Sequence, residues 1–184
     1  MLSEIKEKIR ELPKEYIALL FTSPENYVVL YYDVLKLLVN DLDYAGVIIT
    51  INKPARVLVS NLKDKDIEIK NINIIDCISN SVGVNKEVDN TIYIDTPSNL
   101  NKLNISIKKQ LKELKDKEKT FLMFDSLTTL LLYNSTGSVL KFINYLTTRM
   151  KSSGVGGVFI TVEEGLDKKF VNQVIQFCDD VIRT

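Results

Sequence analysis

Short apolar runs rich in β-branched residues alternate with helix-length segments along the chain, and this alternation constrains the fold more than any other feature. The strand-like runs are apolar on both faces rather than on one. Such strands are typical of a parallel sheet that helices cover on both sides. The sequence therefore predicts a three-layer α/β fold with a mainly parallel sheet. The expected strands are residues 16–21, 45–51, 72–77, 91–94, 120–124, 155–162 and 181–183.

Helix-length segments occupy the spaces between these strands. A short amphipathic helix is expected over residues 3–12, because Pro13 ends the pattern. After a turn cluster at residues 22–26, residues 27–42 are apolar nearly all round, which predicts a helix that is buried on most sides. The other expected helices are residues 55–62, 127–133, 139–150 and 168–177, together with a long helix that Ser98 caps. Residues 79–90 are expected to form a polar loop.

The long helix after Ser98 has an apolar stripe and a charged face. Its apolar residues recur at steps of three or four, which is the helical period. They are Leu100, Leu103, Ile107, Leu111 and Leu114. The charged residues between them are Lys108, Lys109, Lys112, Glu113 and Lys115. We expect these charges to form a solvated helix face rather than a binding site.

The length of the chain suits one domain with a substantial core. At 184 residues, two full domains would be cramped. No linker, internal repeat or low-complexity stretch divides the sequence. We therefore expect a single domain over residues 1–184, with an N-terminal helix in residues 1–13 and the core in residues 16–183.

The charge balance argues against partners that are bound by electrostatics. Lysine plus arginine and aspartate plus glutamate both number 24, so the formal net charge is zero. Proteins that hold nucleic acid or anionic membranes mainly by charge usually have a basic excess. The polar start has no signal-peptide core, and Asp33 and Lys36 interrupt the most apolar run. We expect a soluble, cytoplasmic protein that does not bind a membrane. The composition does not call for nucleic-acid binding, although it leaves room for a local basic patch.

The chain contains no histidine and only two cysteines. The lack of histidine excludes histidine general bases, Ser-His-Asp and Cys-His catalysis, and histidine-ligated metals. Cys77 and Cys178 lie among apolar neighbours and lack the spacing of zinc ligands, so we expect reduced, buried thiols. The alternative is that the two form a disulfide or a metal pair.

The connection after the first expected strand is where a parallel α/β sheet would bind a phosphate. A phosphate-binding loop needs glycines, a lysine for the charge and a Ser/Thr hydroxyl for magnesium. The residues present are Ser23, Pro24, Glu25, Asn26, Tyr27, Val28 and Val29, with neither glycine nor lysine among them. Glu25 would repel a phosphate by about 4 kcal/mol per charge pair at close range.

Residues 121–134, with four apolar residues followed by Asp125-Ser126-Leu127-Thr128, form the most specific motif of the chain. This motif resembles the Walker B strand of the KaiC-like branch of the RecA-type P-loop ATPases. Residues 158–164 are similar to the core strand that follows in that family, and residues 178–183 to its terminal strand. The resemblance extends over residues 16–183 and implies a RecA/KaiC-like fold.

The resemblance also implies that most of the ATPase machinery is missing. The family's Walker A lysine falls at Val28, and its magnesium-binding hydroxyl at Val29. The acidic pair that precedes a proline in the family falls at Asn52 and Lys53. Asp125, with the neighbouring Ser126, is what remains, and phosphoryl transfer depends on the lost groups. We therefore expect a pseudo-ATPase with no catalytic residues, no cofactor and no metal.

Two roles for Asp125 are compatible with the sequence. It is expected to be a leftover polar residue that caps the helix beginning near Leu127. The alternative is a surviving contact to magnesium or nucleotide.

Three further groups of residues are expected to be structural. Residues 154–157 contain three glycines before a strand, which favours a helix-to-strand connection with a glycine cap. Glu163 and Glu164 are expected in a solvated loop rather than as a catalytic pair. Three tyrosines after the degenerate loop are expected to pack the first core helix, with an aromatic partner surface as the alternative. They are Tyr27, Tyr31 and Tyr32.

The leading functional hypothesis is a non-catalytic regulatory or scaffold subunit that acts through protein–protein assembly. By resemblance, the partner would be a second copy of the chain or an active RecA/KaiC-type paralogue, in regulatory assemblies of the archaeal KaiC-like kind. One alternative is an accessory mediator of DNA recombination or repair, which the neutral charge disfavours. The other is an atypical nucleotide-binding ATPase that uses Asp125.

Overall fold

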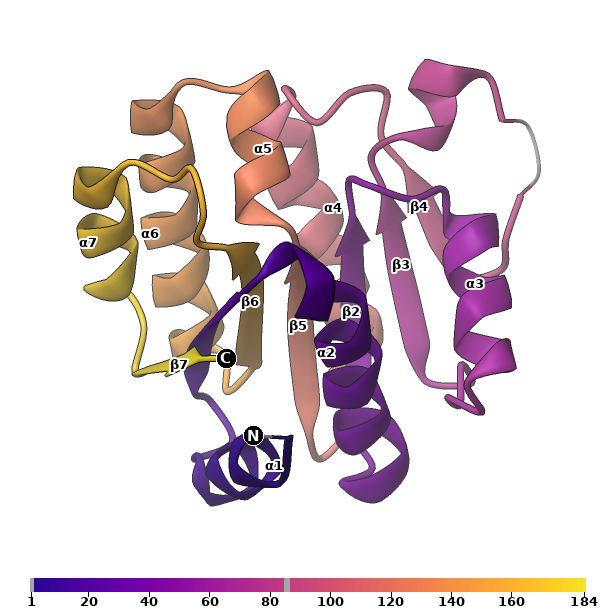
Figure 1. The fold of residues 1–184 in the computed structure, drawn as a ribbon. Helices are drawn as coiled ribbons and strands as arrows, with labels where there is room; N and C mark the ends of the chain where they lie inside the picture. Colours follow the sequence, from indigo (N-terminus) through magenta and orange to yellow (C-terminus); the bar gives the residue numbers. More distant parts are fainter. Residues whose placement is uncertain (1, 85–86) are drawn as a thin grey trace.

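The computed structural model describes residues 2–84 and 87–184. Its centre is one parallel sheet of seven strands in the order β4-β3-β2-β5-β6-β1-β7 (Figure 1). The predicted parallel α/β fold is thereby confirmed. The strands are β1 (Ile17–Thr22), β2 (Ala45–Thr50), β3 (Ile72–Asp76), β4 (Thr91–Tyr93), β5 (Thr120–Asp125), β6 (Gly156–Val162) and β7 (Asp180–Arg183).

Helices cover both faces of this sheet (Figure 1). One face packs against α1 (Leu2–Glu11), α2 (Pro24–Lys36) with its π-helical extension η1 (Leu37–Asp41), and α3 (Ala55–Asp64). The other face packs against α4 (Leu100–Glu113), α5 (Leu127–Tyr133), α6 (Thr136–Ser152) and α7 (Lys168–Ile175). None of the helices in the described residues has both the length and the apolar character needed to cross a bilayer.

The alternation of side chains along β1 shows how the two apolar layers form. Leu19 and Phe21 belong to the core that α4, α5, α6 and α7 cover, whereas Ala18 and Leu20 belong to the core on the opposite face. Successive side chains of a strand point to opposite faces, so a strand between two helix layers must be apolar throughout. This requirement explains the unbroken apolar runs in the sequence.

Three helix starts differ from the sequence expectations. Helix α6 begins at Thr136 rather than at Val139. Helix α2 begins at Pro24 rather than at Tyr27, so the expected turn at residues 22–26 was wrong in most of its length. Proline is well accommodated in the first helical turn, because the amide that it lacks would have no helical partner there. Helix α4 is capped by Asn99 instead of Ser98: the Asn99 side chain accepts a hydrogen bond from the Lys102 amide at 3.0 Å.

Other connections follow the sequence more closely. Gly154, which follows the C-cap residue of α6, has a φ of +67°, the left-handed conformation expected of a glycine at a helix end. Gly157, by contrast, lies inside β6, where an added Cβ would be 2.8 Å from the methyl carbon of Met150. Part of the expected loop at 79–90 is a 3₁₀ turn, η2 (Ser79–Val82), and residues 85–86 of that loop lie outside the described residues.

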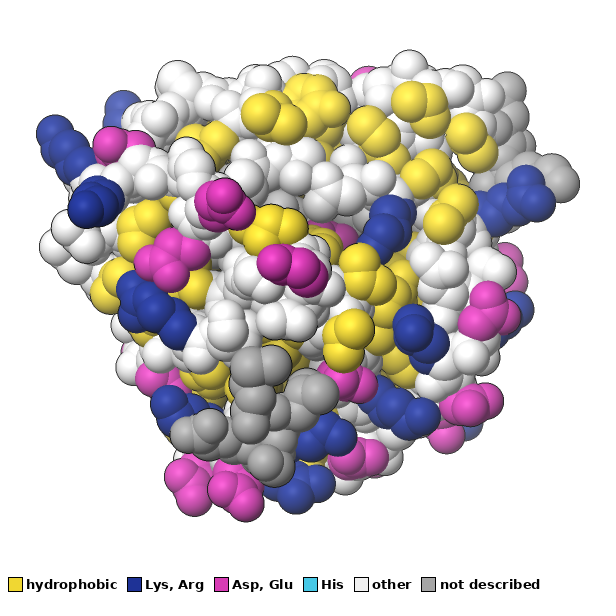
Figure 2. Space-filling model, in the orientation of Figure 1, with side chains coloured by type: hydrophobic (Ala, Val, Ile, Leu, Met, Phe, Trp, Pro, Cys, Tyr) yellow, Lys and Arg dark blue, Asp and Glu magenta, His cyan; other side chains and the backbone are white. Residues whose placement is uncertain are grey.

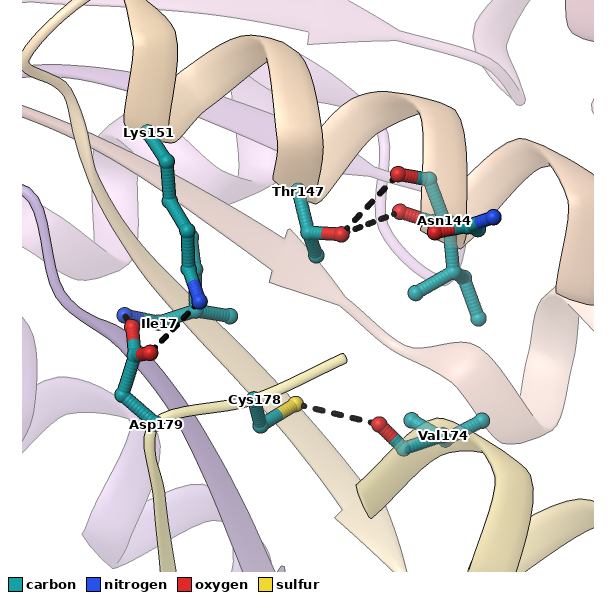
Figure 3. Close-up of polar contacts among 8 residues, drawn as sticks. Ile17, Asn144, Thr147, Lys151, Val174, Cys178 and Asp179 are labelled. Atoms are coloured by element: carbon teal, nitrogen blue, oxygen red, sulfur yellow. Dashed lines mark hydrogen bonds and ion pairs between the residues drawn. The ribbon is translucent and has the colours of Figure 1, made fainter. Parts of the chain in front are cut away.

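Asp179 joins three elements at the amino-terminal edge of the sheet (Figure 3). Its Oδ2 atom accepts a hydrogen bond from the Ile17 amide at 2.8 Å, and its Oδ1 atom forms an ion pair with Lys151 of α6. The start of β1 is therefore tied both to the residue before β7 and to the end of α6.

Both cysteines are unpaired. Cys77 is buried, and the half-buried Cys178 donates its thiol hydrogen to the Val174 carbonyl at 3.4 Å (Figure 3). Burial raises the pKa of each thiol to about 12, so both remain protonated at neutral pH. Within the described residues, no three Cys, Asp or Glu side chains form a cluster suited to a metal ion.

Candidate functional site

The connection between β1 and α2 consists of a single residue, Ser23. The amides of Asn26 and Tyr27 both donate to the Ser23 carbonyl, at 3.2 and 3.1 Å. A phosphate-binding loop instead presents several free backbone N–H groups to its anion. The direct passage from strand into helix leaves no such loop at this position.

Glu25 places a negative charge in the first turn of α2. The hydroxyl of Ser23 donates a hydrogen bond to this carboxylate and lowers its pKa, so Glu25 is ionised at neutral pH. The positive end of the helix dipole thus faces an acidic side chain of the protein itself. A phosphate approaching the same helix end would meet this charge.

The side chains at the expected lysine and magnesium positions are exposed. Val28 is 46% and Val29 55% exposed, and neither side chain has a hydrogen-bond donor. Tyr31 and Tyr32, by contrast, are buried against the sheet, and Tyr27 stacks on Tyr31 with a centroid distance of 6.4 Å. Packing of α2, the expected role of the three tyrosines, is therefore their observed role.

Asp125 lies at the end of β5, next to the end of β2, because these two strands are neighbours in the sheet. Asn52 donates from Nδ2 to Asp125 Oδ1 at 3.1 Å, although 73 residues separate them in sequence. Thr129 of α5 in turn donates its hydroxyl hydrogen to Asn52 Oδ1 at 2.6 Å. The three side chains form a hydrogen-bonded chain across the carboxyl edge of the sheet.

Asp125 is almost completely buried, with 1% of its surface exposed. Desolvation raises the pKa of this carboxyl group to about 7, because burial disfavours its charged form. The expectation that Asp125 caps the following helix was wrong. Ser126 is the cap of α5, and its side chain accepts from the Thr129 amide at 3.4 Å.

Lys53, at the second position where the resemblance implies an acidic pair, turns toward α2. Its Nζ atom lies 5.3 Å from the ring centre of Tyr31 and 5.5 Å from that of Tyr32. This atom is buried and has no hydrogen-bond partner among the described residues. Desolvation accordingly lowers the pKa of Lys53, while the two aromatic faces favour its charged form. The side chain of Lys53 thus points to the tyrosines of α2 and takes no part in the hydrogen bonds between Asn52, Asp125 and Thr129.

Asp76, which is not among the predicted site residues, organises the neighbouring strand end. One carboxylate oxygen accepts from the Ala55 amide at 2.6 Å and from the Ser79 hydroxyl at 2.6 Å. The other accepts from the amides of Ile78 and Ser79 at 2.9 and 2.8 Å. Asp76 is fully buried and fixes the starts of both α3 and η2. Its position at the end of an apolar strand was the only sequence signal.

Glu163 and Glu164 lie at a depression of about 240 Å³ beside the ends of β1 and β7. Both are exposed, and Glu163 forms an ion pair with Arg183 at 3.3 Å. The ion pair is at the surface, where such pairs contribute little to stability. This agrees with the expected solvated loop.

A surface without charged side chains follows β5. From Ser126 to Leu140 the sequence has no Asp, Glu, Lys or Arg. Leu132 is 80% and Tyr133 41% exposed on this stretch. In Figure 2 the upper middle of the molecule, over α5, shows hydrophobic and uncharged atoms, with the charged side chains mainly below and to the sides. Exposed apolar surface that lacks charge is typical of the centre of protein interfaces.

Comparisons with known proteins address the fold. Residues 34–184 match a family described as a family of unknown function, DUF7504. No curated protein matches the sequence significantly. Among solved structures, the chain is similar to the KaiC-like protein PH0186 from the hyperthermophilic archaeon Pyrococcus horikoshii OT3. The TM-score is 0.66 and the sequence identity is 15%. The match covers 94% of this chain and 72% of that chain. At this identity the likeness concerns the fold, and it confirms the RecA/KaiC-like architecture.

Proposed function

Because the chain belongs to the DUF7504 family and has a RecA/KaiC-like fold, we propose that it is a non-catalytic relative of the RecA-type ATPases that acts by assembling with another protein. The observation that carries this proposal is the one-residue connection between β1 and α2. The backbone amides there already donate within the first turn of the helix, and Glu25 places a negative charge where a phosphate would bind.

The surroundings of Asp125 support the same conclusion. A carboxylate that binds magnesium must present its oxygens to the metal, whereas Asp125 is buried and already accepts from Asn52. Where the ATPase family has an acid that activates water, this chain has an amide that donates to Asp125. Asn52 therefore has a structural role at the strand ends and does not activate water.

Thermal denaturation in the presence of Mg-ATP tests the lack of nucleotide binding. We expect no change in the melting temperature, because the β1–α2 connection has no anion-binding loop. A nucleotide at a hundred times its dissociation constant would stabilise the protein by about 2.7 kcal/mol, which is easily measured at this size. An intact RecA-type ATPase in the same assay provides the positive control. A reproducible stabilisation of this chain, or phosphate release by it, would contradict the proposal.

The uncharged surface after β5 is the best candidate for the assembly interface. It belongs to the same carboxyl edge as Asp125 and carries the exposed Leu132 and Tyr133. The partner that this proposal names is a second copy of the chain or an active RecA/KaiC-type paralogue. Native mass spectrometry distinguishes the two, since a homo-oligomer forms from the purified chain alone.

Leu132→Lys should break this assembly. A lysine placed in the centre of an apolar contact must lose its hydration without gaining a partner, so we expect at least a tenfold weaker complex, or about 1.4 kcal/mol. Ile105→Lys is the matched control, because Ile105 is 69% exposed and lies on a different helix, α4. Equal effects of both variants would argue against the α5 surface. A chain that stays monomeric and captures no RecA-type protein would argue against assembly itself.

A further inference from the structure

A basic pocket of about 470 Å³ lies at the amino-terminal edge of the sheet, between the ends of α4 and α6. It is distant in the fold from Leu132 and Asp125, which follow the carboxyl end of β5, whereas the pocket includes Thr120 at the beginning of that strand. Five cationic side chains line it: Lys108, Lys112, Lys115, Lys117 and Arg149.

Few carboxylates face the cations of this pocket among the residues that the structure describes. The one carboxylate in the lining, Glu118, forms an ion pair with Lys14 at 3.2 Å. None of the five lining cations forms an ion pair in the part of the chain that the structure describes. Lys117 donates to the Asn71 amide oxygen and Arg149 to the Tyr145 hydroxyl, both of them neutral acceptors. In a chain of zero net charge, the pocket is therefore a local concentration of unpaired cations.

The spacing of the lysines on and directly after α4 by itself predicts a solvated helix face. The structure adds two cations from other segments, Lys117 from the loop before β5 and Arg149 from α6. Like charges gathered around one depression repel each other, and an anionic ligand would relieve this repulsion. The convergence from three segments is what distinguishes a pocket from an ordinary solvated helix face.

The other groups in the pocket indicate which kind of anion fits. Its lining includes the apolar side chains of Leu111, Leu114 and Val155. The pocket is at the carboxyl ends of α4 and α6, so it offers helix carbonyls rather than the N–H groups that cradle phosphate. Its lining has no aromatic ring on which a nucleic-acid base could stack. Carboxylates that reach the lysine tips, together with an apolar side chain on the pocket wall, match this combination.

We propose that the pocket between α4 and α6 binds an acidic peptide segment of a partner protein, with aspartate or glutamate side chains against the five cations and an apolar side chain against Leu111, Leu114 and Val155. This site goes beyond the assembly proposed for the α5 surface and does not depend on it, because the two lie at opposite edges of the sheet.

A fluorescein-labelled peptide of sequence Glu-Glu-Leu-Glu-Glu-Leu-Glu-Glu, followed by fluorescence anisotropy, tests the proposal. We expect saturable binding that weakens as salt is added. The double variant Lys108→Glu/Lys112→Glu should bind the peptide at least about tenfold more weakly. The matched control is Lys168→Glu/Lys169→Glu on α7, which makes the same change in net charge at exposed positions outside the pocket and should alter the affinity by less than about twofold.

Two further variants test the same proposal independently of the first. If the first double variant does not fold, Lys115→Gln/Lys117→Gln removes pocket charge outside the helix and should also weaken binding. Leu132→Lys should leave peptide binding unchanged, which separates this site from the α5 surface. The proposal is overturned if the wild-type protein does not bind the peptide, if both charge-reversed pairs lose affinity equally, or if oligothymidylate or inorganic phosphate binds the pocket more tightly than the peptide does.

Discussion

Asp76→Ala should lower the free energy of unfolding by about 3 to 6 kcal/mol, the largest effect that we expect from any single polar side chain in this protein. The substitution leaves the amides of Ala55, Ile78 and Ser79 without their acceptor, and a buried donor without a partner costs about 1 to 3 kcal/mol. Because this is a large share of the stability of a typical domain, the melting temperature should fall by about 10 °C or more.

Chemical and thermal denaturation followed by circular dichroism would measure this effect. Asp95→Ala is the matched control: Asp95 follows β4 as Asp76 ends β3, but its side chain is exposed and pairs with Lys102 at the surface. The control should leave the unfolding transition nearly unchanged. Similar losses in the two variants would show that the hydrogen bonds to Asp76 are not what holds α3 and η2 in place.

Asp125→Asn should have the opposite sign and stabilise the protein at alkaline pH. Burial raises the pKa of Asp125 to about 7, above its value in the unfolded chain. At acidic pH, below the unfolded-state pKa, the carboxyl group is protonated in both states and the wild type carries no penalty. As pH rises, the unfolded state gives up its proton first, so the wild type loses stability until the folded pKa is passed. The shift corresponds to about 4 kcal/mol at most.

The stability of the two proteins should therefore be similar near pH 4 and diverge up to pH 8. Urea denaturation at several pH values would show the divergence as a growing difference in midpoint. Asp64→Asn, at an exposed position on α3, provides the control and should show no comparable dependence on pH. If Asp125→Asn is instead destabilising at pH 8, the carboxylate has a favourable partner that desolvation alone does not describe.

The two aspartates illustrate different uses of a strand end. Asp76 and Asp125 end β3 and β5, and both are buried. Asp76 has four donors directed at its oxygens, whereas Asp125 receives one from Asn52. A buried carboxylate is stable in proportion to the hydrogen bonds that replace its hydration. Asp76 is thus expected to increase the free energy of unfolding, whereas the ionised form of Asp125 is expected to decrease it.

Most of the secondary structure could be predicted from the sequence because the signals are local. Apolar runs of strand length identified β2, β5 and β6 to within a residue or two, and the period of three or four residues identified α4. The start of α2 was missed because Pro24 and Asn26 are common in turns, although proline is equally compatible with a first helical turn.

The candidate site was only partly predictable. Its residues Asn52 and Asp125 were found through the family resemblance, but their hydrogen bond was not, because it joins side chains 73 positions apart. Asp76 was missed for the same reason: its partner amide at Ala55 is 21 positions away, and no local pattern distinguishes a buried strand-end carboxylate from an exposed one. The gathering of Lys117 and Arg149 with the lysines of α4 was equally invisible.

The amino-acid sequence by itself determined the order of strands and helices along the chain, and it determined that the first connection has neither glycine nor lysine. Backbone preference and hydrophobic period act between near neighbours, so they can be read without knowing the fold. Only the tertiary structure decided that β2 pairs with β5, that Asn52 therefore meets Asp125, and that five cations surround one pocket. These features depend on which distant segments pack together and on how much water that packing removes.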